Sequence, residues 1–114
     1  MERELKEIDI DQKMIYNRSY FKIAWMVQWQ KKLDKQIGEL PEAIQLQFRA
    51  LVREIQLSGP VRGNWKNYGK LGATRHHCHI KSGRPTYVVC WEMIDKKVKI
   101  VEVYYVGTHE KAPY

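Results

Sequence analysis

Four polar side chains that can hold phosphate or move protons fall on one face of an expected β-strand at residues 75–81. Side chains of a strand alternate between its two faces, and Cys78 and Ile80 suit the inner one. His76 shares that inner face by the same count. The outer face carries Arg75, His77, His79 and Lys81. Two imidazoles beside two cations can bind a phosphate group and exchange protons near neutral pH.

The chemistry that this set favours is cleavage of RNA. RNA supplies its own nucleophile, the ribose 2′-OH, so one base and one acid are enough to transfer the ester bond. Cations beside them would stabilise the charge that develops on the phosphate. No metal and no organic cofactor is expected. Cleavage of DNA would need an external nucleophile, usually with a metal held by carboxylates, and the surrounding segment offers no acidic cluster.

The positive charge of the chain is concentrated around this strand. The formal net charge is +7, and residues 55–91 contain six basic residues and no acidic ones. These are Arg62, Lys66, Lys70, Arg75, Lys81 and Arg84. A stretch of this length without acids favours a polyanionic partner; a chance cluster on an ordinary surface is the alternative.

The C-terminal tail carries residues that could complete such a site. His109, Lys111 and Tyr114 follow the last expected strand, and a tail of this kind can fold back over the outer face. Tyr114 could then stack on an RNA base. A zinc site of His77, His79 and His109 is an alternative that the basic neighbours disfavour.

Glutamates on the later strands could also reach the outer face. If the odd-numbered residues of 101–105 face the core, then Glu102 and Tyr104 lie on the outer side, and Glu92 joins them by a similar count. A glutamate there could act as a base or orient a histidine. We favour a cross-strand salt bridge instead.

The segments that must position these residues form one domain over residues 1–114. Residues 1–12 are highly charged and could be a flexible or accessory arm, and the apolar run at 14–16 suits a first strand. A helix is predicted over 19–37 because large apolar residues recur there at every fourth position, and Gly38 would end it. The recurring residues are Phe21, Trp25, Trp29, Leu33 and Ile37.

A second helix should begin at Pro41 and end at Ser58-Gly59-Pro60. The short link between the two helices favours an antiparallel hairpin. Residues 61–73 are expected to be mostly loop, with a short strand around Trp65. Further strands are expected at 75–81, 86–94 and 98–106. The predicted fold class is therefore α+β: an N-terminal strand and a two-helix antiparallel hairpin, packed on a mainly antiparallel sheet of about four strands.

The cysteines and the N-terminal residues indicate in which cellular compartment the protein is expected. The chain has two cysteines, Cys78 and Cys90, which we expect to be buried thiols. No apolar run is long enough for a transmembrane helix, and the N-terminus is too charged for a signal peptide. These features predict a cytoplasmic protein that does not engage a membrane.

Three short segments resemble a known family. They are Gly63-Asn64-Trp65-Lys66-Asn67-Tyr68, Cys78-His79-Ile80-Lys81 and Val106-Gly107-Thr108-His109. They are similar to the YafQ-like and RelE-like mRNA interferases of the RelE/ParE toxin superfamily. The region 76–114 also resembles cytotoxic translational repressors of toxin–antitoxin systems. The likeness covers about residues 13–114 and is strongest from Gly63 onward.

The resemblance implies a toxin of a type II toxin–antitoxin system that enters the ribosomal A site and cuts mRNA. A cognate antitoxin would neutralise it by wrapping its surface. By position, His79 matches the strand histidine of the family and His109 the C-terminal histidine, while Tyr114 resembles the terminal aromatic residue, one position further from His109. The chain departs from the YafQ-like pattern at Gly83, where that pattern has an acid, and near Gly59-Pro60, where it has a histidine.

The candidate residues fall into two groups. The catalytic candidates are His79, His109, His77 and Tyr114. The candidates for binding RNA phosphate are Arg75, Lys81, Arg84, Lys66, Lys70 and Lys111. Two other functions stay open on the sequence alone: a non-catalytic module that binds RNA or the ribosome, and a ParE-like inhibitor of gyrase.

Overall fold

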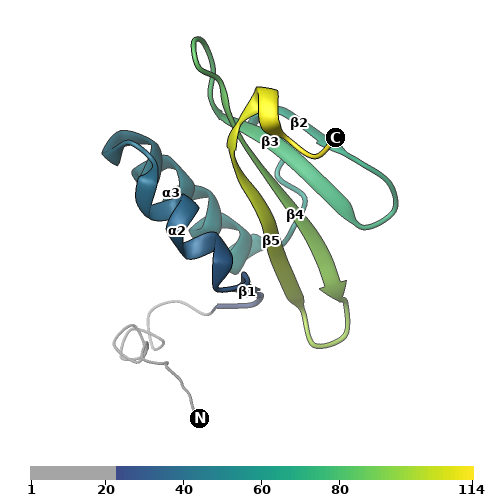
Figure 1. Ribbon diagram of the computed structural model, residues 1–114. Helices are drawn as coiled ribbons and strands as arrows, with labels where there is room; N and C mark the ends of the chain where they lie inside the picture. Colours follow the sequence, from purple (N-terminus) through teal and green to yellow (C-terminus); the bar gives the residue numbers. More distant parts are fainter. Residues whose placement is uncertain (1–22) are drawn as a thin grey trace.

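A computed structural model describes residues 23–114 of the chain. Across these residues, a pair of helices lies on one face of a five-stranded sheet (Figure 1). The strands are β1 (Met26–Gln28), β2 (Lys66–Lys70), β3 (Arg75–Lys81), β4 (Tyr87–Asp95) and β5 (Ile100–Thr108). The helices are α2 (Lys32–Glu39) and α3 (Glu42–Ser58). The predicted α+β fold class is confirmed, with one strand more than expected.

The sheet is antiparallel except at one edge. Its spatial order is β1-β5-β4-β3-β2, and β1 pairs with β5 in parallel. The strands predicted at the C-terminal end of the chain are confirmed, although β4 and β5 begin one and two residues later than expected. The short strand expected near Trp65 is β2, which pairs with β3.

The predicted helix over 19–37 is wrong toward its N-terminal end. Residues 26–28 form β1, and the helix starts only at Lys32. The apolar residues Trp25, Val27 and Trp29 also obey the period of two that a strand requires, and all three pack against the core from an extended segment. The strand predicted at 14–16 and the arm at 1–12 lie outside the described residues.

The boundaries of the helices follow from proline and glycine. Helix α2 continues through Gly38 to Glu39, so Gly38 does not end it, and Pro41 precedes α3 as predicted. Helix α3 ends at Gly59, whose φ of 98° is easily adopted only by glycine. A Cβ on Gly59 would also meet the Trp25 indole nitrogen at 3.0 Å. Within residues 23–114 neither helix has the length and hydropathy of a membrane span.

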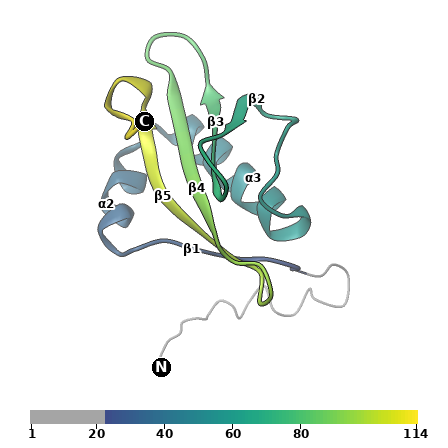
Figure 2. The same cartoon turned by 90° about the vertical axis from the view of Figure 1, so that its right-hand side faces the viewer.

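The core lies between the helices and one face of the sheet. Helix α3 contributes Ile44, Phe48, Leu51 and Ile55, all buried. From β3, Cys78 and Ile80 point into the same core, as predicted. The view in Figure 2 places the sheet in front and both helices behind it, so neither α2 nor α3 covers the opposite face of the sheet.

His76 lies on the core side, as its place in the strand predicted. Its side chain is 3% exposed. Its Nδ1 lies 2.7 Å from the hydroxyl of Tyr68, and its ring stacks on Trp91 with centroids 5.8 Å apart. Burial lowers the pKa of His76, with a smaller contribution from the charge of Lys70. This imidazole is therefore a structural group that favours its neutral form.

Acidification should destabilise the fold through His76. Because its pKa is lowered in the folded state from the ordinary value of 6.5, the stability that it contributes is complete above that value and is lost as the pH falls through the folded-state pKa. The unfolding free energy is measured by urea unfolding at about pH 7.5 and about pH 5. Between these two pH values it should fall less for His76→Phe than for the wild type. An equal loss in both proteins would contradict this role.

Candidate functional site

The outer face of the sheet carries a second buried layer that the helices do not touch. Val88 pairs with His79 across β3 and β4, and Cys90 pairs with His77. Cross-strand partners point to the same face, so Val88 and Cys90 lie on the outer side, yet both are 0% exposed. Neither belongs to the helix-covered core cluster. Something other than a helix must therefore cover them.

The C-terminal segment lies over this face. After β5 the chain forms a short 3-10 helix, η2 (His109–Lys111), and then returns across the outer face, where Figure 2 shows the C-terminus in front of the sheet. The backbone N–H of His109 donates to the carbonyl of Thr86 at 2.8 Å. The ring of Tyr114 reaches that of His77, with centroids 4.7 Å apart. The tail thus folds back over the outer face, as predicted.

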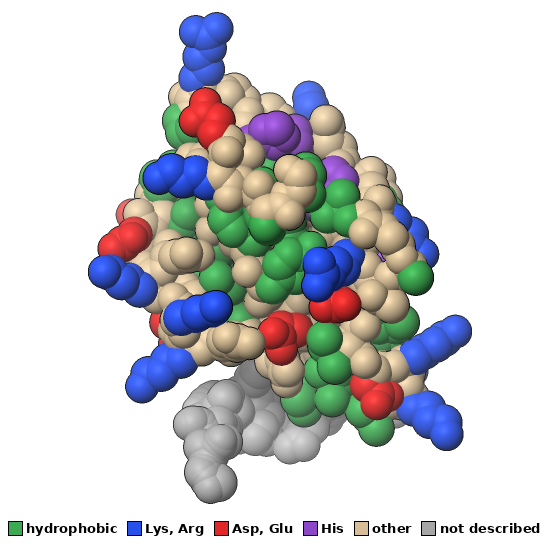
Figure 3. Space-filling view, turned by 45° about the vertical axis from the view of Figure 1, so that its right-hand side comes forward, with side chains coloured by type: hydrophobic (Ala, Val, Ile, Leu, Met, Phe, Trp, Pro, Cys, Tyr) green, Lys and Arg blue, Asp and Glu red, His purple; other side chains and the backbone are tan. Residues whose placement is uncertain are grey.

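Three histidines and one tyrosine meet there. The ring centroids of His79 and His109 are 5.5 Å apart, and those of His109 and Tyr114 are 6.0 Å apart. We refer to His77, His79, His109 and Tyr114 as the histidine cluster. Figure 3 shows histidine side chains at the surface among mostly uncharged neighbours, with lysine and arginine at the periphery. All four residues named from the sequence as catalytic candidates are brought together.

The surroundings of the cluster shift its proton equilibria. Burial lowers the pKa of His77, and the charge of His109 lowers it further. The pKa of His79 is also lowered, first by burial and then by the charges of His109, His77 and Lys66. Both imidazoles therefore favour the neutral form, which can accept a proton. Burial raises the pKa of Tyr114, so its phenol keeps its proton.

One buried imidazole nitrogen in the cluster has no hydrogen-bond partner within residues 23–114. It is Nδ1 of His77, which is buried. An unpaired buried nitrogen of this kind is costly. In the same region, no three His, Cys, Asp or Glu side chains are grouped so that they could hold a metal ion.

The cations named from the sequence do not all lie at the cluster. Lys66 pairs with His79 across β2 and β3, and its charge reaches that ring. Lys81 donates to the carbonyls of Ser82 and Pro85 at 3.3 and 3.1 Å, in the hairpin that also carries Arg84. Arg84 lines one pocket together with His109.

The remaining basic candidates lie elsewhere. Arg75 sits over the ring of Tyr104, 5.1 Å from its centroid, and its Nε lies 3.6 Å from a carboxylate oxygen of Glu92. Lys70 pairs with His76 and affects that ring on the core side. Lys111 lines a separate pocket with residues of α2. The sequence suggested one group of basic residues because of their charge, but the fold places them in different parts of the molecule.

The predicted role of the glutamates is confirmed for Glu92, which forms a cross-strand ion pair with Arg75. Glu102 instead accepts a hydrogen bond from Gln28 at 3.0 Å. The expectation that Tyr105 faces the core is wrong. The register shifts between Cys90 and Trp91, so Tyr105 stands opposite Cys90, and Val106 is the next buried residue of β5.

Tyr105 is a structural residue that the sequence did not reveal. Its hydroxyl donates to the carbonyl of Thr108 at 2.6 Å and so fixes the turn that leads into His109. A Cβ on Gly107 would lie 2.7 Å from the same hydroxyl oxygen. Because real Cβ atoms do not approach so closely, the glycine of the Gly-Thr-His motif makes room for this hydrogen bond.

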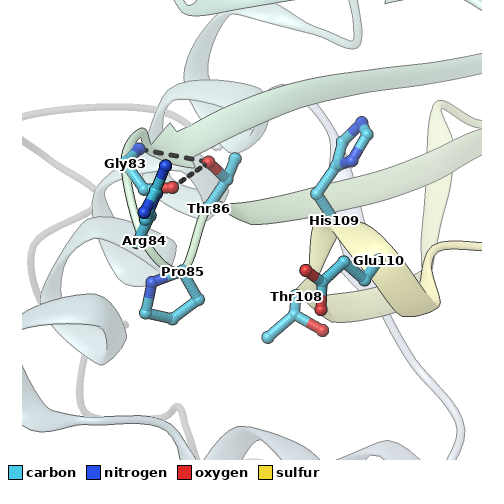
Figure 4. A pocket seen from close by; sticks show the side chains of 7 residues that line it. All are labelled: Gly83, Arg84, Pro85, Thr86, Thr108, His109 and Glu110. Carbon is cyan, nitrogen blue, oxygen red and sulfur yellow. Dashed lines mark hydrogen bonds between the residues drawn. The ribbon is translucent and has the colours of Figure 1, made fainter.

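A pocket of about 510 Å³ adjoins the cluster at His109 (Figure 4). It lies between the β3–β4 hairpin and the segment that follows β5. Its walls are Gly83, Arg84, Pro85, Thr86, Thr108, His109 and Glu110. Among these, only Arg84 and His109 are site candidates from the sequence, because the two walls are far apart along the chain.

Comparisons with known proteins show the fold. No family model matches the sequence, and no curated protein matches it. Among solved structures, the archaeal RelE–RelB complex from Pyrococcus horikoshii is similar at 13% identity and a TM-score of 0.53, over 78% of this chain and 99% of the other. The isolated E. coli RelE toxin is similar at 23% identity and a TM-score of 0.53, over 79% and 89%. The intact E. coli RelBE complex gives 22% identity and a TM-score of 0.53, over 77% and 100%.

These likenesses define the class of fold. The two helices packed on a five-stranded, mostly antiparallel sheet form a RelE-like toxin fold.

Removal of His109 should raise the pKa values of its two neighbours in the cluster. In His109→Gln the charge that lowers the pKa of both His77 and His79 is gone. Titration of the imidazole protons by NMR should therefore show both values moving up toward the ordinary 6.5. Lys111→Gln, in the same tail, is the control and should leave both titrations in place. Unchanged values in His109→Gln would show that the three rings are not electrostatically coupled.

Tyr105 and Gly107 should be energetically coupled. Tyr105→Phe removes one hydrogen bond and should cost about 1 kcal/mol of unfolding free energy. Gly107→Ala should cost more, because the new methyl group meets the Tyr105 hydroxyl. Since Tyr105→Phe removes that oxygen, Gly107→Ala should be less destabilising in the Phe background. Urea unfolding of the four proteins tests this, and additive effects would exclude the contact.

Proposed function

We propose that this chain is the toxin of a type II toxin–antitoxin system and that it represses translation as an mRNA endoribonuclease. The observation that carries the proposal is the histidine cluster on the face of a RelE-like fold that α2 and α3 leave open. Ring contacts connect His79 to His109, His109 to Tyr114 and Tyr114 to His77, and the pKa values of His77 and His79 are lowered. A binding surface alone would not require this arrangement.

The reaction needs only side chains of the cluster and the 2′-OH of the substrate. Neutral His79 accepts the proton of the 2′-OH, and the freed oxygen attacks the adjacent phosphorus. His109 donates a proton to the departing 5′-oxygen. The products are a 2′,3′-cyclic phosphate and a 5′-hydroxyl. Lys66, opposite His79, stabilises the charge on the phosphate, and Tyr114 and His77 orient the sugar and base.

The partners follow from the same surface. Lys66 lies opposite His79, and Arg84 lines a pocket together with His109. This positive charge suits the phosphates of mRNA, and on the ribosome the substrate would be presented as a single strand. Solved structures of similar fold include RelE–RelB and RelBE toxin–antitoxin complexes, which supports a cognate antitoxin for this chain. The place of action that follows is the cytoplasm.

Cleavage should depend on both histidines that contact each other in the cluster. His79→Gln and His109→Gln should each lower the rate of RNA cleavage by about 100-fold or more, because each removes one proton-transfer group. The rate is measured on a defined mRNA with and without ribosomes, and the 2′,3′-cyclic phosphate ends are identified by mass spectrometry. Growth arrest on induced expression should disappear in the same two variants. Lys96→Ala, in the distant β4–β5 turn, is the control and should cleave like the wild type.

Two results would contradict the proposal. Growth arrest that persists in the double variant of His79 and His109 would indicate a non-catalytic module that binds RNA or the ribosome. Inhibition of DNA supercoiling without RNA cleavage would indicate a gyrase inhibitor.

A further inference from the structure

The carboxylate of Glu54 on α3 accepts three hydrogen bonds from the segment that connects this helix to β2. Its Oε1 accepts from Nδ2 of Asn64 at 2.9 Å, from Nε1 of Trp65 at 2.9 Å and from the guanidinium of Arg62 at 3.2 Å. All three donors belong to residues 62–65, and all three reach the same oxygen. Glu54 is therefore the point at which this segment is fixed to the helix.

The carboxylate of Glu54 is held in its charged form. Burial raises its pKa, but the hydrogen bonds from Asn64, Trp65 and Arg62 and the charge of Arg62 lower it, and the net shift is downward. Hydrogen bonds to a charged acceptor are stronger than those to a neutral one. The Arg62 side chain is only 17% exposed, so its pairing with Glu54 is partly shielded from water.

The connecting segment depends strongly on such side-chain contacts. Figure 2 shows it running from the helix layer to the edge of the sheet. Its turn is closed by the backbone N–H of Trp65, which donates to the carbonyl of Arg62 at 2.9 Å. At its start, Nε1 of Trp91 donates to the carbonyl of Pro60 at 2.9 Å. The end of the segment, where β2 begins, is held by Glu54.

Lys66 follows this segment directly and is separated from the rest of β2 by an irregularity. It pairs with His79, but the register of β2 shifts before its next pair with β3. Asn67, which lies in this irregularity, has a φ of 53°. Because an irregularity of this kind disrupts the ladder locally, the later pairs of β2 do not by themselves set the place of Lys66. Its other neighbour along the chain is Trp65, which Glu54 holds.

We propose that Glu54 is a positioning residue for RNA cleavage: by holding residues 62–65 it keeps the ammonium group of Lys66 beside His79. The inference rests on the proposed function, because Lys66 acts there on the charge of the reacting phosphate. Lys66 would contact the substrate, and Glu54 would act through it from the helix layer. A carboxylate beneath the sheet thus sets the place of a cation at the histidine cluster.

The position of Lys66 can be measured without RNA. Burial lowers the pKa values of both His77 and His79, but the charge of Lys66 contributes to the shift of His79. Glu54→Leu removes the acceptor of all three hydrogen bonds. NMR titration of the imidazole protons should therefore show the pKa of His79 rising, as it should in Lys66→Ala, while that of His77 stays in place. A general loosening of the fold would instead raise both values.

Matched variants assign the effect to the hydrogen bonds. Trp65→Phe keeps an aromatic ring and removes only the donor next to Lys66, so the pKa of His79 should rise by less than in Glu54→Leu. Glu54→Gln keeps an acceptor oxygen and should also have a smaller effect. Glu42→Leu, which removes an exposed acid at the start of the same helix, should change neither histidine. If circular dichroism shows that Glu54→Leu does not fold, Trp65→Phe decides the question.

Two results of these titrations would overturn the inference. One is a His79 pKa that stays unchanged in the folded variants at Glu54 and Trp65. The other is an equal rise for His77 and His79, which would indicate a purely structural role.

Rates of RNA cleavage test the catalytic consequence. Glu54→Leu should lower kcat about tenfold and change KM less, because Lys66 acts on charge that develops in the transition state. In the Lys66→Ala background the same change should lower kcat by less than about twofold, since the group that Glu54 positions is already gone. Losses that multiply in the double variant would show that Glu54 acts by another route and would overturn the inference.

The two measurements separate this inference from the proposed function. A rise of the His79 pKa in Glu54→Leu without RNA cleavage by the wild type would contradict the ribonuclease and still support the placement of Lys66 by Glu54. Cleavage by the wild type, with no effect of Glu54→Leu on the His79 pKa or on kcat, would overturn the inference and leave the ribonuclease in place.

Discussion

The return of the C-terminal segment onto the outer face of the sheet is the constraint on which the candidate site depends. Two hydrogen bonds hold it: the Tyr105 hydroxyl to the carbonyl of Thr108, and the backbone N–H of His109 to the carbonyl of Thr86. The segment lies over the face that carries Val88 and Cys90, which are buried outside the core cluster beneath α2 and α3. It also supplies half of the histidine cluster. Packing and candidate chemistry thus rest on the same few residues.

The sequence predicted the fold class because most of its periodic signals allow one interpretation. Helix α3 has a proline before it, a glycine after it and a buried stripe between them. The segment around Trp25 and Trp29 was ambiguous, because a spacing of four residues satisfies both a helix and an alternating strand. Residues 26–28 form a strand because they pair with β5. That pairing joins the first and last strands of the described chain, and no local sequence pattern predicts it.

The candidate site was predictable where the strand is regular. Strand β3 keeps its alternation through His79, so the core position of His76 and the outer positions of His77 and His79 followed from counting. Strand β5 has an irregularity opposite Cys90, which moved Tyr105 off the expected face. Lys70 and Lys111 were grouped with the cluster by charge alone, and their separation depends on tertiary structure. The pocket at Glu110 depends on two loops that meet only after folding.

The parallel edge of the sheet has a consequence for synthesis of the chain. Among the described strands, β1 pairs only with β5, which is made last, and β5 lies between β1 and β4. During translation β1 therefore has no partner until residues 100–108 have left the exit tunnel. The cluster forms later still, because His109 and Tyr114 follow β5 in the chain. A nascent chain that lacks the residues after β5 therefore cannot contain the histidine cluster.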